Sequence, residues 1–352
     1  HDNENIQGTI ISGAHNGSSL IIRYGNIEPT IMGLTFQDGT GTSMVLESGC
    51  ANLSEKSGGA ILIYKAYPTI NYNRFINNGF DEQAGGGTGE SVADGGAVSH
   101  YASEDVQFDE DRGHAGQATG STRTIPTTMN IQNNYYENNS AGNGENFYSH
   151  GYGGSIDVSN SIFENIDCES SSVNEFVLRS VENEADYIQN DISGNCIEES
   201  IFYVSSEIGN DTNDGTEETE PFKTIRHALT LVRENETPTT INIDRGVYSP
   251  STGEKFPIVL PDNVHLIGDE METTVLNADA NVENQAAVIV ILEVENVVVA
   301  NMTLTGGSSE GHGCAGGGGL LIAANDMYNT ETEEGTNIAS TYPVIENVII
   351  EN

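Results

Sequence analysis

Internal repetition constrains the fold of this chain more than any other feature of its sequence. Residues 9–14 (TIISGA) match residues 274–279 (TVLNAD) at an offset of 265. Three further matches follow in the same order: 34–36 with 302–304, 58–63 with 317–322, and 67–70 with 342–345. A supersecondary unit that recurs along a chain is typical of a solenoid. We therefore predict the later coils of one large repeat over 1–200 and the first coils of a second over 201–352.

A shorter unit recurs inside each copy. It consists of a Gly-Gly turn, a few alternating apolar residues, a second short strand and an Asn-rich turn, as in the stretches that begin at 58, 95 and 153. Every apolar piece has the length of a strand, so the repeats are predicted to be all-β. We expect short parallel strands stacked about 4.8 Å apart around a narrow aliphatic core. Asn at equivalent turn positions tolerates left-handed backbone conformations and can bond to the Asn of the next coil as a ladder.

One segment departs from this pattern and predicts a helix near 221–233. Apolar residues at helical spacing form one face, and Pro221 is placed to begin the helix. The face consists of Phe222, Ile225, Ala228, Leu229 and Val232. Because the end of a solenoid exposes its core, an amphipathic helix here is expected to cap the first coil of the second copy.

The run from Phe202 to Asp279 resembles the N-terminal section of pectate-lyase-like parallel β-helix proteins. The similarity lies in the loop GNDTNDG at 209–215, the helix start PFKTI at 221–225, RGVY at 245–248, and LIG at 266–268 followed by TVL. The Gly-rich stretch before Leu320 and the closing PVIENVIIEN resemble repeats of large secreted surface proteins of that superfamily. The resemblance implies a right-handed parallel β-helix. It leaves function open, because the superfamily contains lyases, hydrolases, epimerases, adhesins and phage tailspikes.

Charge excludes two classes of partner. Lys and Arg number 12 against 53 Asp and Glu, giving a net charge of −41. Such a surface repels nucleic-acid phosphates and anionic lipid headgroups. No stretch approaches the roughly 18 consecutive apolar residues that a membrane-spanning helix needs. We therefore expect neither nucleic-acid binding nor membrane insertion.

Four cysteines occur, and none forms a CxxC pair, which argues against structural zinc and thioredoxin-like chemistry. Cys168 and Cys196 are 28 residues apart, about one coil with its loops, so we predict that they form a disulfide in an oxidising compartment. Cys50 and Cys314 fall in equivalent loops of the two copies. Their partners are left open, with cysteines of neighbouring copies or chains as the alternatives.

Catalysis of the kind found in this superfamily would need clustered carboxylates with a basic partner. The richest candidate loop carries Asp105, Asp109, Asp111, Arg112 and His114. A pair of these carboxylates could serve as acid and base in glycoside hydrolysis. Against this, the loop reads as a long excursion from the coil, and charge runs of this type are usually solvated surface. No residue is therefore assigned a catalytic role.

Calcium is a stronger hypothesis than catalysis. Asp211, Asn213 and Asp214 place alternating oxygen ligands before Gly215, although the spacing is not that of an EF-hand. The competing interpretation is an Asx-turn that joins a strand to the helix. No cofactor is required by the sequence, and Ca²⁺ is the one we consider.

The leading functional hypothesis is an extracellular or cell-surface structural protein or adhesin. Neither end of the sequence reads as a capped solenoid end, so the expected partners are copies of the chain end to end or further repeats of a longer parent chain. The alternative is a polysaccharide-active enzyme, either lyase or hydrolase, or a carbohydrate-binding β-helix. A glycan ligand would then be expected on one sheet, among Tyr, Asp and basic side chains.

Overall fold

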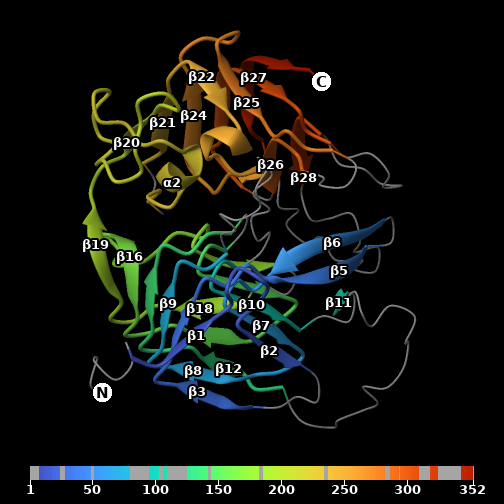
Figure 1. The fold of residues 1–352 in the computed structure, drawn as a ribbon. Coiled ribbons are helices and arrows are strands. Elements are labelled where there is room, and N and C mark those ends of the chain that lie inside the picture. Colours follow the sequence, from blue (N-terminus) through green and yellow to red (C-terminus); the bar gives the residue numbers. More distant parts are fainter. Residues whose placement is uncertain are drawn as a thin grey trace, which may run out of the picture. The chain divides into compact units, whose positions relative to one another are not determined.

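In the computed structural model the chain divides into two units, unit 1 at 1–197 and unit 2 at 198–352 (Figure 1). Nearly all regular secondary structure in the described residues is β-strand. The structure describes residues 8–23, 28–48, 51–79, 95–102, 106–108, 125–141, 144–181, 185–233, 237–281, 286–292, 294–308, 318–323 and 342–351.

Unit 1 is a parallel solenoid with three sides. Sheet A contains β1 (Ile10–Ser12), β4 (Thr35–Gln37), β9 (Arg74–Ile76), β13 (Tyr135–Glu137), β16 (Ile162–Asp167) and β19 (Ser193–Ile197) in that order. Sheet B contains β2 (Leu20–Arg23), β7 (Ile61–Tyr64), β10 (Val98–Tyr101), β14 (Phe147–His150) and β17 (Leu178–Val181). The third side contains β3 (Thr30–Met32) with β8 (Thr69–Asn71), and β12 (Thr128–Asn130) with β15 (Ser155–Asp157) and β18 (Asp186–Ile188). The chain visits the three sides in turn, and every pairing within them is parallel.

The core of unit 1 is a set of columns, because each coil places its inward residues above those of the coil before. In sheet A the aromatic rings of Phe36, Phe75, Tyr136 and Phe163 stack with centroids 5.4, 5.2 and 4.9 Å apart. Their planes lie within 12° of parallel. Stacked strands keep equivalent side chains about 4.8 Å apart, which is close to the contact distance of such rings.

Asn ladders join the coils at their corners, as the sequence predicted. Asn73 and Asn134 are buried, and Oδ1 of Asn134 accepts from the backbone N–H of Asn73 (2.9 Å) and from its side-chain amide (3.3 Å). Asn78 and Asn139 repeat the arrangement at 3.2 and 3.0 Å. The corner before sheet A contains a residue with a left-handed conformation in successive coils, with φ of 58° at Tyr72 and 57° at Asn133. These amides satisfy corner backbone groups that would otherwise be buried without partners.

Unit 2 follows the same plan. One sheet contains β20 (Ile201–Val204), β21 (Thr239–Ile243), β24 (Val264–Gly268), β27 (Val298–Thr305) and β29 (Val344–Ile350). In the same sheet β25 (Thr274–Asn277) pairs with the second half of β27, and β22 (Gly246–Tyr248) pairs with β25. The other sheet contains β23 (Ile258–Val259), β26 (Ile289–Leu292) and β28 (Leu320–Ala323). The parallel β-helix expected from the sequence is therefore present in both units.

The four sequence matches fall at equivalent places in the two units. The first pairs β1 with β25, and the second pairs β4 with the second half of β27. The third pairs β7 with β28, and the fourth pairs β8 with the first half of β29. The corners agree as well, since Gly33 and Asn301 are equivalent and both have positive φ, 77° and 58°. The repeat seen in the sequence is thus a repeat of coil geometry.

The expected capping helix is present and shorter than predicted. It is α2 (Ile225–Leu229), which begins after Thr224 and is followed by Thr230, whose hydroxyl donates to the His227 carbonyl at 2.7 Å. The predicted apolar face is correct, because Phe222, Ile225, Ala228, Leu229 and Val232 are all buried. Five residues make little more than one turn, so tertiary packing of this face, rather than helix propensity, holds α2 in place.

One excursion leaves the solenoid of unit 1 between β4 and β7. It forms the antiparallel pair β5 (Thr42–Ser48) and β6 (Ala51–Ser57), and β11 (Val106–Phe108) pairs with β5 in an antiparallel direction (Figure 1). The strand β11 comes from a later loop, between β10 and β12. Two excursions from neighbouring coils therefore join into one small sheet.

Candidate functional site

The outward face of sheet B has a second apolar cluster, separate from the solenoid core. Strand alternation sends Ile61 and Ile63 into the core, and Leu62 and Tyr64 to the outside. Tyr101 and Tyr148 join this outer cluster from the next two strands. In register, Tyr64 is followed by Tyr101 and then by His150. We call Tyr64, Tyr101, Tyr148 and His150 the aromatic strip.

The rings of the aromatic strip contact one another. The centroid of Tyr101 lies 5.8 Å from that of Tyr148 and 5.9 Å from that of His150, and Tyr148 lies 6.5 Å from His150. All three pairs are tilted rather than stacked. The Tyr101 hydroxyl hydrogen-bonds the Ser57 hydroxyl at 2.7 Å. The strip is therefore an aromatic platform with polar groups at its margin.

Basic residues border the aromatic strip, although the whole chain has only 12 Lys and Arg. The ammonium of Lys65 lies 5.0 Å from the ring centroid of Tyr64, within cation–π range. Arg23 is in register with Tyr64, and Arg179 is in register with Tyr148. The Arg179 guanidinium forms an ion pair with Glu175 four residues earlier. Positive charge is thus gathered here in an otherwise acidic chain.

The aromatic strip is closed in this structure. Tyr64, Tyr101, Tyr148 and His150 are all buried, and the fully buried Met44 of β5 packs into the same cluster. The sheet of β5, β6 and β11 therefore contributes to the cover. Aromatic rings with bordering cations are suited to stacking against sugar rings and pairing with acidic groups. A ligand could reach these rings only if the residues that cover them moved.

A serine and a histidine also meet inside the solenoid of unit 1. His100 Nδ1 lies 3.2 Å from the Ser149 hydroxyl oxygen, and neither residue is exposed. The His100 ring packs edge-on against Tyr67 and Tyr152, with centroids 5.5 and 5.4 Å away. Burial lowers the pKa of His100 to about 3, so the imidazole is neutral at physiological pH. Its enclosure in the core makes this pair structural rather than catalytic.

Acidic side chains bind the backbone at the start of α2. Asp211 Oδ1 accepts from the backbone N–H of Lys223 (2.8 Å) and of Thr224 (2.9 Å), and Oδ2 accepts from the Thr224 hydroxyl at 3.0 Å. Asn213 donates its side-chain amide to the Pro221 carbonyl at 2.8 Å. Asp214 is exposed. These bonds tie the loop to the helix start across 8 to 13 residues. The loop also has an Asx-type bond, in which Asn210 Oδ1 accepts from the backbone N–H of Thr212 at 3.0 Å.

Glu254 completes the start of the helix and was not predicted from the sequence. Its carboxylate accepts from the backbone N–H groups of Ile225 (2.7 Å), Arg226 (3.3 Å) and Lys255 (3.2 Å). It is 2% exposed, and desolvation by burial raises its pKa to about 7, against the lowering effects of these hydrogen bonds and of Arg226. The sequence carries no signal for it, because 29 residues separate Glu254 from Ile225.

The calcium hypothesis for Asp211, Asn213 and Asp214 stays a prediction. Within the described part of the chain, no group of three or more His, Cys, Asp or Glu side chains is arranged to hold a metal ion. The oxygens of Asp211 already accept three hydrogen bonds. A calcium ion here would have to compete with those donors or share the oxygens with them.

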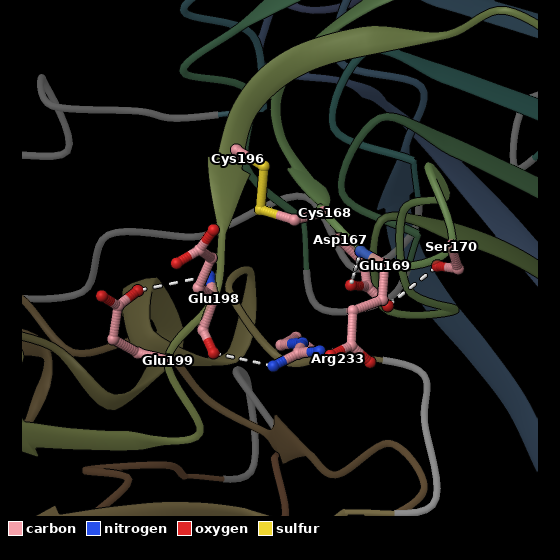
Figure 2. The surroundings of a disulfide bond; sticks show 8 residues. All are labelled: Asp167, Cys168, Glu169, Ser170, Cys196, Glu198, Glu199 and Arg233. Atoms are coloured by element: carbon pink, nitrogen blue, oxygen red, sulfur yellow. Dashed lines mark hydrogen bonds between the residues drawn. A yellow bond between two sulfur atoms is a disulfide. The ribbon is translucent and has the colours of Figure 1, made fainter.

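The predicted disulfide between Cys168 and Cys196 is confirmed (Figure 2). Cys196 lies on β19, and Cys168 directly follows the last residue of β16. The two strands are paired, with Ile166 in register with Cys196. Next to the bond, Asp167 accepts from the backbone N–H of Glu169 at 2.9 Å (Figure 2). The disulfide therefore fastens the last strand of sheet A to the coil before it.

The remaining predicted sites lie outside the described residues. These are Cys50 and Cys314, and the candidate loop residues Asp105, Asp109, Asp111, Arg112 and His114. What the sequence predicts for these residues stays a prediction. No helix in the described ranges is long and apolar enough to cross a membrane.

Comparison with known families gives one match. Residues 207–280 match a family described as Protein of unknown function (DUF1565). The matched segment includes the loop at Asp211, the helix α2 and Glu254. No curated protein and no solved structure matches the chain. The match covers a minor part of the chain, so it indicates similarity of the first coils of unit 2 to that family.

Proposed function

We propose that this protein is an extracellular structural or adhesive protein, in which an acidic parallel β-helix acts as a rigid scaffold at the cell surface. The observation that carries the proposal is the equivalence of the two units. What recurs in both is the framework of strands and left-handed corners. At the place of Tyr64, unit 2 has Ala323. Repetition of the same framework along the chain favours a scaffold.

Two further features support the proposal. The Cys168–Cys196 disulfide fastens neighbouring coils, and such bonds persist mainly in oxidising, extracytoplasmic environments. The net charge of −41 keeps copies soluble and separated at their acidic faces. Stacked parallel coils also pair every internal backbone group with the coil above and below, which makes a solenoid stiff along its axis.

Location tests this proposal directly. Antibody raised against the whole chain should label the outside of intact source cells, and external protease should remove the label without lysing them. An antibody against a cytoplasmic protein provides the control for leakage. Label confined to the cytoplasm of permeabilised cells would contradict the proposal.

Carbohydrate binding is the second candidate function, favoured by the aromatic strip and its bordering cations. Affinity electrophoresis in gels containing a polyuronate or a neutral glucan would test it. Tyr148→Ala should abolish retardation by the bound glycan. Tyr135→Ala is a matched control, because Tyr135 also lies against a cation, Arg74, with 4.9 Å from the guanidinium carbon to the ring, but belongs to sheet A. Equal retardation of both variants and the parent would exclude the strip as the glycan site.

A further inference from the structure

The sequence contains six Asn-x-Ser/Thr triplets, the acceptor motif of N-linked glycosylation. They begin at Asn16, Asn52, Asn138, Asn210, Asn235 and Asn301. The motif uses two groups: the side-chain amide nitrogen of the Asn, which receives the sugar, and the hydroxyl two residues later. In a chain rich in Asn, Ser and Thr many such triplets arise by chance. The contacts that these two groups already make in the fold therefore decide which triplets can carry a glycan.

Two of the triplets are built into the solenoid. The Asn138 amide donates to Asn77 Oδ1 at 2.6 Å in a corner ladder, so a sugar on its nitrogen would crowd the neighbouring coil. In the triplet that begins at Asn301, the Thr303 side chain is the second group. Thr303 is 4% exposed, and its hydroxyl donates to the Met271 carbonyl at 2.8 Å. In both triplets, one of the two groups serves the fold.

The triplet at 16–18 is half engaged. Asn16 is exposed, but the Ser18 hydroxyl donates to the Gly58 carbonyl at 2.6 Å and accepts from the Thr42 hydroxyl at 3.0 Å. This hydroxyl is therefore occupied between neighbouring coils. The side chains of Asn52 and Asn235 are outside the described part of the chain.

The triplet Asn210-Asp211-Thr212 differs from these, because neither of its two groups holds the fold. Asn210 and Thr212 are both exposed. Among the described residues, none forms a hydrogen bond with Asn210 Nδ2 or with the Thr212 hydroxyl. The Asx-type bond from the Thr212 backbone N–H to Asn210 Oδ1 brings the first and third residues of the motif together in one turn.

The other groups of this loop fasten it to the body of unit 2. The Asn210 backbone N–H donates to the Pro221 carbonyl at 3.1 Å, and the Asn210 carbonyl accepts from the Asn213 backbone N–H at 2.9 Å. The side chains of Asp211 and Asn213 bind the segment that begins α2. The middle residue of the triplet is thus used by the fold, while the two outer side chains are left to solvent on a fixed turn.

We propose that Asn210 is a site of N-linked glycosylation. The reaction needs a transferase and a sugar activated as a glycosyl phosphate. Asn210 Nδ2 forms a bond to the anomeric carbon of the sugar, and the bond from that carbon to the phosphate oxygen breaks. The phosphate leaves with the electron pair, and one amide proton passes to a base of the transferase. The inference rests on the proposed extracellular location, since this modification marks surface loops of secreted proteins.

Mass spectrometry of the chain purified from the surface of its source cells tests the site. After reduction of the disulfide, cleavage after Lys and Arg leaves each of three triplets alone in one peptide: Asn210 in 180–223, Asn138 in 124–179 and Asn301 in 256–352. Peptide 180–223 should be heavier by whole sugar residues in most copies of the chain, with fragment ions that place the added mass on Asn210. The other two peptides should have their unmodified masses.

Variants expressed in the same cells separate motif-directed attachment from any other. Asn210→Gln should lose the sugar, and Thr212→Ala should lose it although Asn210 remains, whereas Thr212→Ser should keep it. Asn138→Gln is the matched control, because it removes a different exposed triplet Asn and should leave the added mass unchanged. Circular dichroism should show that the variants are folded.

An unmodified peptide 180–223 would overturn the inference, as would a sugar that persists on Asn210 in Thr212→Ala. Antibody labelling of intact cells reports location and does not depend on the glycan at Asn210. A chain that is labelled at the surface but has a bare Asn210 therefore contradicts this inference alone, and a chain absent from the surface contradicts the proposed function.

Discussion

The buried Asn ladder offers the sharpest test of how the coils are held together. Asn134 is 1% exposed, and its amide donates to the carbonyls of Ile70 (2.7 Å) and Ile131 (2.8 Å). Asn134→Asp keeps the shape of the side chain and its acceptor oxygen, but replaces the two N–H donors by an oxygen that faces two carbonyls. Each buried carbonyl left without a donor costs about 1–3 kcal/mol, so we expect the coil to lose about 4 kcal/mol.

Hydrogen exchange followed by mass spectrometry measures this loss locally, which matters because a chain with two units need not unfold in one step. A loss of about 4 kcal/mol corresponds to exchange roughly a thousandfold faster in peptides covering β12 and β13. Asn138→Asp is the matched control. Asn138 lies in the same coil and donates to Asn77 at 2.6 Å, but it is exposed, so its replacement should cost no more than about 0.5 kcal/mol.

Acid supplies a second, independent signature. When the carboxyl introduced by Asn134→Asp is protonated, it regains one donor, so the defect should shrink as the pH falls through the raised pKa of this buried group. If Asn134→Asp accelerated exchange no more than Asn138→Asp at neutral pH, the buried ladder would not be a source of stability and the reasoning would be refuted.

Three further predictions concern the ends of the units. Reducing the disulfide, or replacing Cys168 and Cys196 by Ser, should destabilise the last coil of unit 1 by about 3.6 kcal/mol, the value that the loop-entropy relation gives for a separation of 28 residues. Hydrogen exchange in β19 should become faster. Unchanged exchange rates would contradict this prediction. Burial raises the pKa of Glu254 to about 7 in the native state, so the native state holds this proton more tightly than the unfolded chain does, and the stability of the α2 cap should fall by roughly 3 kcal/mol as pH rises from about 4.5 to 7. Glu254→Gln should abolish this pH dependence. Thermal melts at several pH values would show it in the parent alone. Asp211→Ala removes three hydrogen bonds at the helix start and should cost about 2 kcal/mol in calcium-free buffer. Calorimetric titration with Ca²⁺ tests the metal hypothesis, and identical weak heats for parent and Asp211→Ala would remove it.

The architecture was predictable because the same sequence pattern recurs from coil to coil in a solenoid. The matches at offsets near 265, the Gly-Gly turns and the Asn-rich corners all carry the coil pattern in local sequence. The Cys168–Cys196 bond followed from the same regularity, since a separation of about one coil places two residues on adjacent strands. The apolar face of α2 was also readable from its spacing, even though the helix is shorter than the segment that carries the pattern.

The aromatic strip was not predictable, because a short strand made only of apolar residues does not indicate which side chains face the core and which face outward. Residues 61–64 read ILIY and show no alternation, so Leu62 and Tyr64 cannot be assigned to the outer face from the sequence. Only the register of β7 with β10 and β14 places Tyr64, Tyr101 and His150 in one row. Glu254 was missed for a related reason, since its partners on α2 are distant in sequence and meet it only in the fold.

The spacing between stacked strands in sheet A has a consequence for how this protein can vary. Thr35 lies 25 residues after its partner Ile10, whereas Tyr135 lies 61 residues after its partner Arg74. The strands stack equally well in both cases, so extra residues between coils leave the core columns undisturbed. Loop closure becomes only slowly more costly with length, which makes such additions tolerable. The fold thus separates the parts that must keep their lengths, the short strands and the corners with the Asn ladders, from turns that can accept whole new segments.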